Sequence, residues 1–164
     1  MEPSKDLIIQ TLRQIPDPEI PVIDIYELGI LKDVELDFFV KTVKVVITPT
    51  YSGCPAMKQI EDDIKTKVAE VCDWTCIVNM VYAPAWTTDS ITPEARERLR
   101  NYGIVPPEKA TVDKSALSGS PKVLKCPRCS SLNTEMISQF GSTACKALFR
   151  CKDCLEPFDY FKCI

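Results

Sequence analysis

Two Cys-x-x-Cys pairs near the C-terminus constrain the fold of this 164-residue chain more than any other feature. Cys126 and Cys129 form the first pair, Cys151 and Cys154 form the second, and 21 residues separate the two pairs. Each pair can turn two sulfurs toward one ion, and Zn²⁺ prefers four such soft ligands in a tetrahedron. The spacing therefore predicts a four-cysteine zinc ribbon, in which a structural Zn²⁺ stabilises a module too small to fold alone.

The remaining cysteines near these pairs leave more than one interpretation open. The chain holds nine cysteines, and its first segment, MEPSKDLIIQ, lacks the basic and then apolar order of an export signal. An odd count without export favours reduced thiols and metal over a disulfide framework. Because Cys145 and Cys163 lie outside the pairs, six neighbouring thiols that hold an iron-sulfur cluster are the alternative to zinc. Cys145 by itself is either a buried core thiol or a reactive one, and the role of Cys163 is undecided.

Hydrophobic periodicity predicts an α+β domain ahead of the cysteine pairs. Apolar residues spaced three or four apart predict a helix capped by Ser4, and a longer amphipathic helix from Pro55 to Val71. Alternation over residues 34–38 and 43–47 predicts a hairpin with one buried face. The run TCIVNMVYAP is apolar on both alternating sets, which is typical of an inner strand covered on both faces.

A segment without periodicity divides the second half of the chain. A short helix begins at Thr92 and ends at Gly103, and the following residues 105–121 contain prolines and a serine-rich end, which predicts a linker. We therefore expect a small mixed sheet with packed helices in residues 1–104, the linker over 105–121, and the zinc-ribbon module in 122–164.

Hydropathy and charge argue against two classes of partner. No stretch approaches the roughly 18 uninterrupted apolar residues of a membrane helix, so we expect a cytoplasmic protein without a membrane partner. Residues 122–164 carry 7 Lys and Arg against 4 Asp and Glu. Four thiolates around one Zn²⁺ would bring this module close to neutrality, and a neutral module attracts phosphate backbones weakly. We therefore expect no nucleic-acid partner.

A single cysteine at the predicted strand-to-helix junction is the second candidate site. Cys54 follows the turn residues Ser52 and Gly53 and precedes Pro55, a favoured first residue of a helix. At such an N-cap the free amides and the helix dipole lower the pKa of a thiol, which predicts a nucleophile or a soft-metal ligand. The alternative is a cysteine that only packs beneath the helix start.

Carboxylates are the side chains expected beside Cys54, because the chain has no histidine. The absence of histidine excludes a Cys-His catalytic pair within one subunit. The candidate neighbours are Asp17, Glu19, Asp24 and Asp89. One thiolate with carboxylates makes a weak and exchangeable metal site, which suits delivery of a metal better than its retention.

Several longer motifs resemble a known family. They are IPDPEIPVIDIYELGI, TPTYSGCPAM, PAWTTDSITPEARERLRNYGIVPP, CPRC and the cysteine-rich end that begins FGSTACKALFRC. Together they resemble the PaaD family, the small accessory proteins of the phenylacetyl-CoA epoxidase system in the aerobic phenylacetate pathway. The N-terminal part also resembles the wider family of small iron-sulfur assembly domains. That resemblance implies a functional role for Cys54 and places Asp17, Pro18 and Glu19 in the same motif set.

The resemblance implies an accessory protein rather than an enzyme. The epoxidase of that pathway forms the ring 1,2-epoxide of phenylacetyl-CoA at a di-iron centre, which needs histidine ligands that this chain lacks. The implied role is maturation, in which Cys54 is the transfer thiolate for a transient iron ion or iron-sulfur cluster. The alternative is a structural or electron-relay component whose C-terminal cysteines hold an iron-sulfur cluster. The implied partners are other subunits of the epoxidase complex or its reductase, and a homodimer that pairs two Cys54 sites is a further option.

Overall fold

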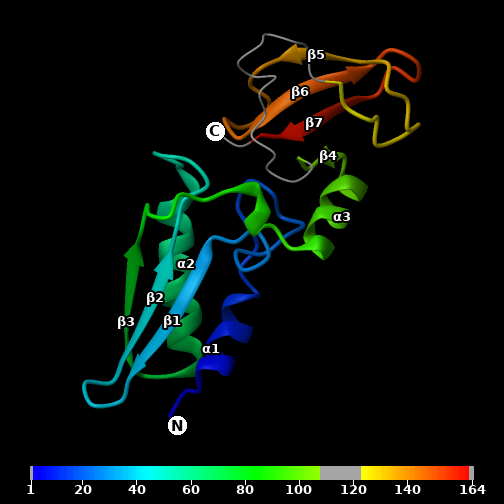
Figure 1. Cartoon of the computed structure of the whole chain (residues 1–164). Helices are drawn as coiled ribbons and strands as arrows, with labels where there is room; N and C mark the ends of the chain where they lie inside the picture. Colours follow the sequence, from blue (N-terminus) through cyan, green and yellow to red (C-terminus); the bar gives the residue numbers. More distant parts are fainter. Residues whose placement is uncertain (1, 108–122, 163–164) are drawn as a thin grey trace. The chain divides into compact units, whose positions relative to one another are not determined.

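The computed structural model describes residues 2–107 and 123–162 (Figure 1). Its backbone contacts divide the chain into two compact units, Met1–Trp86 with Ser90–Thr92, and Thr87–Asp89 with Pro93–Ile164. Within the described ranges, no helix combines the length and the apolar character needed to cross a bilayer.

The first unit is a three-stranded mixed sheet with two packed helices. Its elements are α1 (Lys5–Leu12), β1 (Leu31–Asp37), β2 (Thr42–Ile47), α2 (Ala56–Val71) and β3 (Thr75–Met80). The strand order is β1-β2-β3, with β1 antiparallel and β3 parallel to the central β2. Helix α1 contacts α2 and β1, and α2 contacts β3. The expected small mixed sheet with packed helices is confirmed.

Local sequence signals account for these elements. The Ser4 side chain caps α1 by accepting a hydrogen bond from the backbone N–H of Leu7 at 3.2 Å. Asp37 shapes the turn of the β1–β2 hairpin, since its side chain accepts hydrogen bonds from the N–H groups of Phe39 and Val40 at 2.9 and 3.1 Å. The predicted apolar stripe of α2 is buried, and it includes Ile60, Ile64 and Val68.

Strand β3 lies at the edge of its sheet, so the prediction of an inner strand covered on both faces is wrong. It pairs with β2 alone among the described strands. Exposed and half-buried residues alternate along it, and only the half-buried set lies in register with the buried side chains of β2. The apolar pattern was misleading because Ile77, on the other set, stays 50% exposed.

The second unit is built on a four-stranded sheet. After the short 3-10 helix η1 (Thr88–Ser90), the chain forms α3 (Pro93–Tyr102), β4 (Ile104–Val105), β5 (Thr134–Ser138), β6 (Lys146–Cys151) and β7 (Pro157–Phe161). The strand order is β4-β7-β6-β5, antiparallel except for the parallel β4–β7 pair. The core of this sheet contains Leu124, Cys126, Ala147, Phe149, Cys151, Phe158 and Tyr160.

Helix α3 and strand β4 group with this second sheet. In β4, Ile104 and Val105 pair with Asp159 and Tyr160 of β7. The boundary that the sequence suggested at residue 104 therefore falls inside the second unit, because a two-residue strand is too short to produce a periodic pattern. Residues 108–121 of the suggested linker lie outside the described residues, and the division into domain, linker and module otherwise stays a prediction.

Candidate functional site

The two Cys-x-x-Cys pairs of the second unit form two turns with matching backbone geometry. In the first turn, the Cys126 N–H donates to the Ser131 carbonyl at 2.8 Å, and in the second the Cys151 N–H donates to the Glu156 carbonyl at 2.9 Å. Each bond spans five residues, so both turns present two sulfurs on one side. A residue with positive φ follows the second cysteine in each turn, namely Ser130 (63°) and Leu155 (64°).

Strand pairing and side-chain hydrogen bonds hold the two turns next to each other. Thr134, the first residue of β5, pairs with Cys151, the last residue of β6. Asp153 of the second turn accepts a hydrogen bond from the Ser131 hydroxyl and another, at 2.7 Å, from the Asn133 side-chain amide. Residues that lie 20 or more apart in sequence thus fix the relative position of the cysteine pairs.

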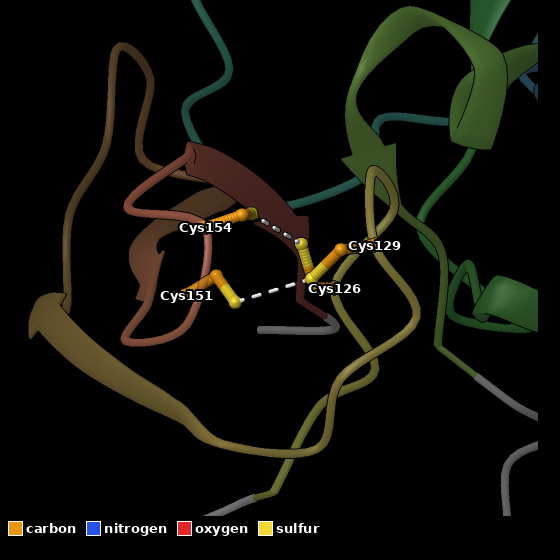
Figure 2. A group of neighbouring side chains, drawn as sticks. All are labelled: Cys126, Cys129, Cys151 and Cys154. Atoms are coloured by element: carbon orange, nitrogen blue, oxygen red, sulfur yellow. Dashed lines mark hydrogen bonds between the residues drawn. The ribbon is translucent and has the colours of Figure 1, made fainter.

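The four sulfurs converge on one point (Figure 2). All four Sγ atoms lie within 4.8 Å of one another. Cys126 and Cys154 are 3.7 Å apart, and Cys129 and Cys151 are 3.5 Å apart. A tetrahedral ion with metal–sulfur bonds of about 2.3 Å separates its sulfurs by about 3.8 Å. The four cysteines therefore fit a single tetrahedral metal ion.

The environment of the four sulfurs is asymmetric. Cys126 and Cys151 belong to the buried core, whereas Cys129 is exposed and Cys154 is half-buried. Hydrogen bonds from the backbone N–H groups of Cys154 and Asp153 lower the pKa of Cys151 to about 7. Cys151 is thus the sulfur whose surroundings most favour the thiolate that a metal requires.

Cys145 is not one of the metal-competent side chains that cluster within the described residues. Its thiol is buried, and its Sγ lies 3.0 Å from the Thr143 hydroxyl. This environment agrees with the interpretation of Cys145 as a core thiol. Cys163 lies outside the described residues.

The Cys54 thiol occupies the predicted junction between β2 and α2, shifted by one position relative to the helix. The N-cap is Pro55, and α2 begins at Ala56. Cys54 is half-buried, and its sulfur accepts hydrogen bonds from the Ala56 backbone N–H and the Tyr51 side chain. Burial nevertheless raises the pKa of this thiol, and the negative charges of Glu19 and Asp17 raise it further. The prediction of a lowered pKa is wrong because desolvation and the two carboxylates outweigh the hydrogen bonds.

The loop between α1 and β1 brings Asp17 and Glu19 toward Cys54. The Asp17 side chain is 5% exposed, and its Oδ1 accepts hydrogen bonds from the N–H groups of Glu19 at 2.9 Å and Ile20 at 2.8 Å. These bonds close a tight turn that fixes the Asp17 carboxylate. The two carboxylates are near enough for their charges to raise the pKa of Cys54. Among the described residues, however, only Cys126, Cys129, Cys151 and Cys154 form a group that could hold a metal ion.

The other two suggested neighbours have different surroundings. Asp24 forms a capping box with Glu27, because its Oδ1 accepts from the Glu27 N–H at 2.8 Å while Glu27 Oε2 accepts from the Asp24 N–H at 3.2 Å. The Arg13 guanidinium lies 4.0 Å from Asp24. These contacts give Asp24 a role in shaping the loop. Asp89 is exposed on η1 and belongs to the second compact unit.

Thr48 is a candidate that the sequence did not single out. It follows β2 on the segment that leads to Cys54, is 1% exposed, and its hydroxyl has no hydrogen-bond partner within the described part of the chain. A buried hydroxyl without a partner is costly and marks a position for a water or a ligand atom. The only sequence signal was a polar residue directly after an alternating apolar strand.

Comparison with known proteins identifies the family. Residues 110–162 match a family model described as a PaaD zinc beta ribbon domain, and residues 5–75 match one described as an iron-sulfur cluster assembly protein. An Escherichia coli (strain K12) protein that is named as a component of 1,2-phenylacetyl-CoA epoxidase is 49% identical over 153 residues, 93% of this chain and 89% of that protein. The chain belongs to the PaaD family. The expectation drawn from its motifs is confirmed.

Relatives of the N-terminal part of this PaaD-family chain carry names from iron-sulfur maturation. An Fe-S protein maturation auxiliary factor of Bacillus subtilis is 37% identical over 101 residues, 60% of this chain and 95% of that protein. A factor of the same name in Porphyromonas gingivalis is 35% identical over 95 residues, 56% and 87% of the two chains. A conserved hypothetical protein of Thermotoga maritima has a solved structure with TM-score 0.51 and 26% identity, over 60% of this chain and 95% of that one.

Proposed function

We propose that this PaaD-family protein is a cytoplasmic, non-enzymatic accessory factor of the phenylacetyl-CoA epoxidase system, and that it assembles or delivers the iron or iron-sulfur centre of that system. The observation that carries the proposal is the Cys54 thiol beside the carboxylates of Asp17 and Glu19, inside the region that matches the iron-sulfur cluster assembly model. The names of the E. coli, B. subtilis and P. gingivalis relatives support the proposal.

The cargo is held weakly at Cys54 for two physical reasons. The raised pKa keeps the thiol protonated near neutral pH, so an incoming iron ion or cluster must displace a proton from Sγ. A single thiolate also offers only one soft ligand, and among the described residues Cys54 does not form a metal-holding group with Asp17 and Glu19. The remaining ligands come from the client protein or from a second copy of this chain. A site of this kind releases its cargo once the client supplies a fuller ligand set.

The ribbon has a structural role in this proposal. The four cysteines hold Zn²⁺, which when bound fixes the two turns and stabilises the small second sheet. The ribbon then docks the client, which is another component of the epoxidase complex or its reductase, while Cys54 carries the cargo. The alternative, an iron-sulfur cluster at these cysteines that relays electrons, is an outcome that the experiment below distinguishes.

The test is the metal and acid-labile sulfide content of anaerobically purified protein, compared between wild type and Cys54→Ser. The matched control is Cys72→Ser, because Cys72 is also a half-buried thiol of the first unit. We expect about one zinc per chain in all three proteins. Iron and sulfide should bind to wild type and Cys72→Ser and should be lost from Cys54→Ser.

Two results would contradict parts of this proposal. Equal iron and sulfide in wild type and Cys54→Ser would place the cluster at the C-terminal cysteines and support the relay function. Normal iron content and activity of the epoxidase in cells that carry only Cys54→Ser would exclude Cys54 as the transfer thiolate.

A further inference from the structure

The exposed strand edges of this protein are protected to very different degrees. Four strands in the described residues lie at a sheet edge: β1 and β3 in the first unit, and β4 and β5 in the second. An edge presents unpaired N–H and C=O groups to any other extended chain, and proteins usually protect it with charges, prolines, bulges or a very short strand.

Three of these four edges carry such protection. β1 is interrupted by a register shift between Leu31 and Asp33, and β4 is only two residues long. β5 has a register shift between Met136 and Ser138, and its Glu135 forms ion pairs with two basic residues of the neighbouring strand segment. The charged residues along β1 are Lys32, Asp33, Glu35 and Asp37.

β3 carries none of these protections. Its sequence, TCIVNM, has no charged residue and no proline, and its register with β2 is continuous from Thr75 to Met80. Every second side chain of β3, namely Thr75, Ile77 and Asn79, is exposed, and Ile77 lies at the centre of the strand. In Figure 1, β3 forms the free edge of the first sheet.

Apolar side chains extend this edge at both ends. The tip of the β1–β2 hairpin lies beside the start of β3, because the Thr75 N–H donates to the Lys41 carbonyl at 3.0 Å. In this tip Phe38 is 55% exposed, Phe39 is 97% exposed and Val40 is 60% exposed. At the other end Tyr82, which follows β3, is 61% exposed. Next to this edge lies a shallow groove with a mixed lining. Its apolar residues are Leu36, Phe38, Val40 and Ile77, and its polar and charged residues are Thr42, Glu35, Asp37 and Lys44.

We propose that β3 pairs antiparallel with β3 of a second copy of this chain, which forms a six-stranded sheet around a two-fold axis. A two-fold interface brings the same patch of both chains together, so the hairpin tip of one copy meets the Tyr82 end of the other. The strand has no charge to repel its own copy, and pairing satisfies the free backbone groups of both edges. This dimer goes beyond the proposed function, because it needs neither Cys54 nor the ribbon metal.

The exposed apolar area is of the size that such an interface requires. Because an aromatic side chain buries roughly 150–250 Å², the three exposed rings with Ile77 and Val40 offer on the order of 600 Å² per copy. A stable interface buries about 800 Å² per partner, and the paired backbone supplies the remainder.

The experiment is sedimentation equilibrium of the full, zinc-saturated chain in the presence of reductant. The variants are Ile77→Lys and Asn79→Lys, two exposed positions of β3, and the matched control is Ile137→Lys. Ile137 is 51% exposed on the edge strand β5, against 50% for Ile77 on β3. We expect the wild-type chain to form a dimer. Its dissociation constant should rise at least about tenfold in both β3 variants, because a lysine charge opposes pairing at the strand edge. In the Ile137→Lys control the dissociation constant should stay unchanged.

Hydrogen exchange at low and high protein concentration supplies the second measurement. The amides of residues 75–80 should gain protection as concentration rises, whereas those of residues 134–138 should not. A wild-type chain that stays monomeric, with β3 left to a strand of another protein, would overturn the proposal. So would a dimer that survives both β3 substitutions, or one that Ile137→Lys dissociates equally.

Discussion

Replacement of Gly29 by alanine should destabilise the first unit far more than the same change at Gly53. Both glycines have positive φ, +78° at Gly29 and +79° at Gly53. A Cβ atom at Gly29 would overlap the side chain of Ser90 and would lie 2.8 Å from its carbonyl oxygen, whereas one at Gly53 would meet nothing within 4 Å. The pair of variants thus separates backbone strain from steric overlap.

The two contributions have known sizes. A non-glycine residue in the left-handed region costs roughly 1–2 kcal/mol, which both variants incur. Overpacking against an ordered neighbour adds roughly 1–3 kcal/mol, which applies to Gly29→Ala alone. We therefore expect about 1–2 kcal/mol for Gly53→Ala and about 2–5 kcal/mol for Gly29→Ala, against a total stability of about 5–15 kcal/mol for a typical domain.

Tryptophan fluorescence in a denaturant titration measures this difference directly. The chain has two tryptophans, and both Trp74 and Trp86 belong to the first unit. The Trp86 indole N–H donates to the Leu28 carbonyl at 2.9 Å, next to Gly29. Excitation near the red edge of tryptophan absorption therefore reports unfolding of the first unit without a signal from the ribbon.

Equal destabilisation by the two variants would refute the reasoning. It would mean that Ser90 moves away from the new Cβ at no cost, so that the contact between the two segments contributes nothing to stability. A larger effect at Gly53 would contradict the geometry of both sites.

Three further predictions concern the ribbon and Cys54. Chelation of zinc should abolish amide protection across residues 123–162 and leave the tryptophan unfolding transition of the first unit in place, and a retained ribbon would contradict this. Leu155→Gly should stabilise the zinc-bound ribbon by about 1 kcal/mol, because Leu155 is exposed at φ 64°; faster zinc loss would contradict it. Glu19→Gln removes a negative charge that raises the pKa of Cys54, so the alkylation rate of Cys54 should rise at lower pH than in wild type, and a shift to higher pH would exclude Glu19 as a neighbour.

The parts of the fold that follow from local patterns could be predicted from the sequence. The Ser4 cap, the apolar stripe of α2 and the alternation in β1 and β2 are local signals, and each corresponds to an observed element. The cysteine pairs were equally informative, since Cys-x-x-Cys geometry is determined within each turn and the four sulfurs do converge. Each pattern succeeded because its chemistry is local, and for the cysteines the preference of one metal ion for four sulfurs supplied the long-range link between the two turns.

The position of β3 in its sheet and the pKa of Cys54 could not be predicted, because both depend on residues that are distant in sequence. An apolar strand pattern does not show whether the strand pairs with one or with two neighbouring strands, and β3 pairs with one among the described strands. The helix start alone favoured a low pKa for Cys54, but the pKa depends on burial and on Glu19 and Asp17, which lie more than 30 residues earlier. Burial and the charges of Glu19 and Asp17 arise from the tertiary structure, so the sequence close to residue 54 does not reveal them.

Under the proposed function, the contrast between the two kinds of thiol lets one chain retain one metal and release another. Four sulfurs within 4.8 Å of one another complete a tetrahedron without help from another molecule, so we expect Zn²⁺ added to the protein to be retained in the ribbon. Zn²⁺ also binds sulfur more strongly than Fe²⁺ does, and a permanently ionised Cys54 would compete for it. The raised pKa of Cys54 counters this competition, because each unit of increase above neutral pH lowers metal affinity about tenfold. Under the proposed function, burial and the charges of Glu19 and Asp17, which together raise this pKa, keep Cys54 available for a cargo that arrives with further ligands from a partner.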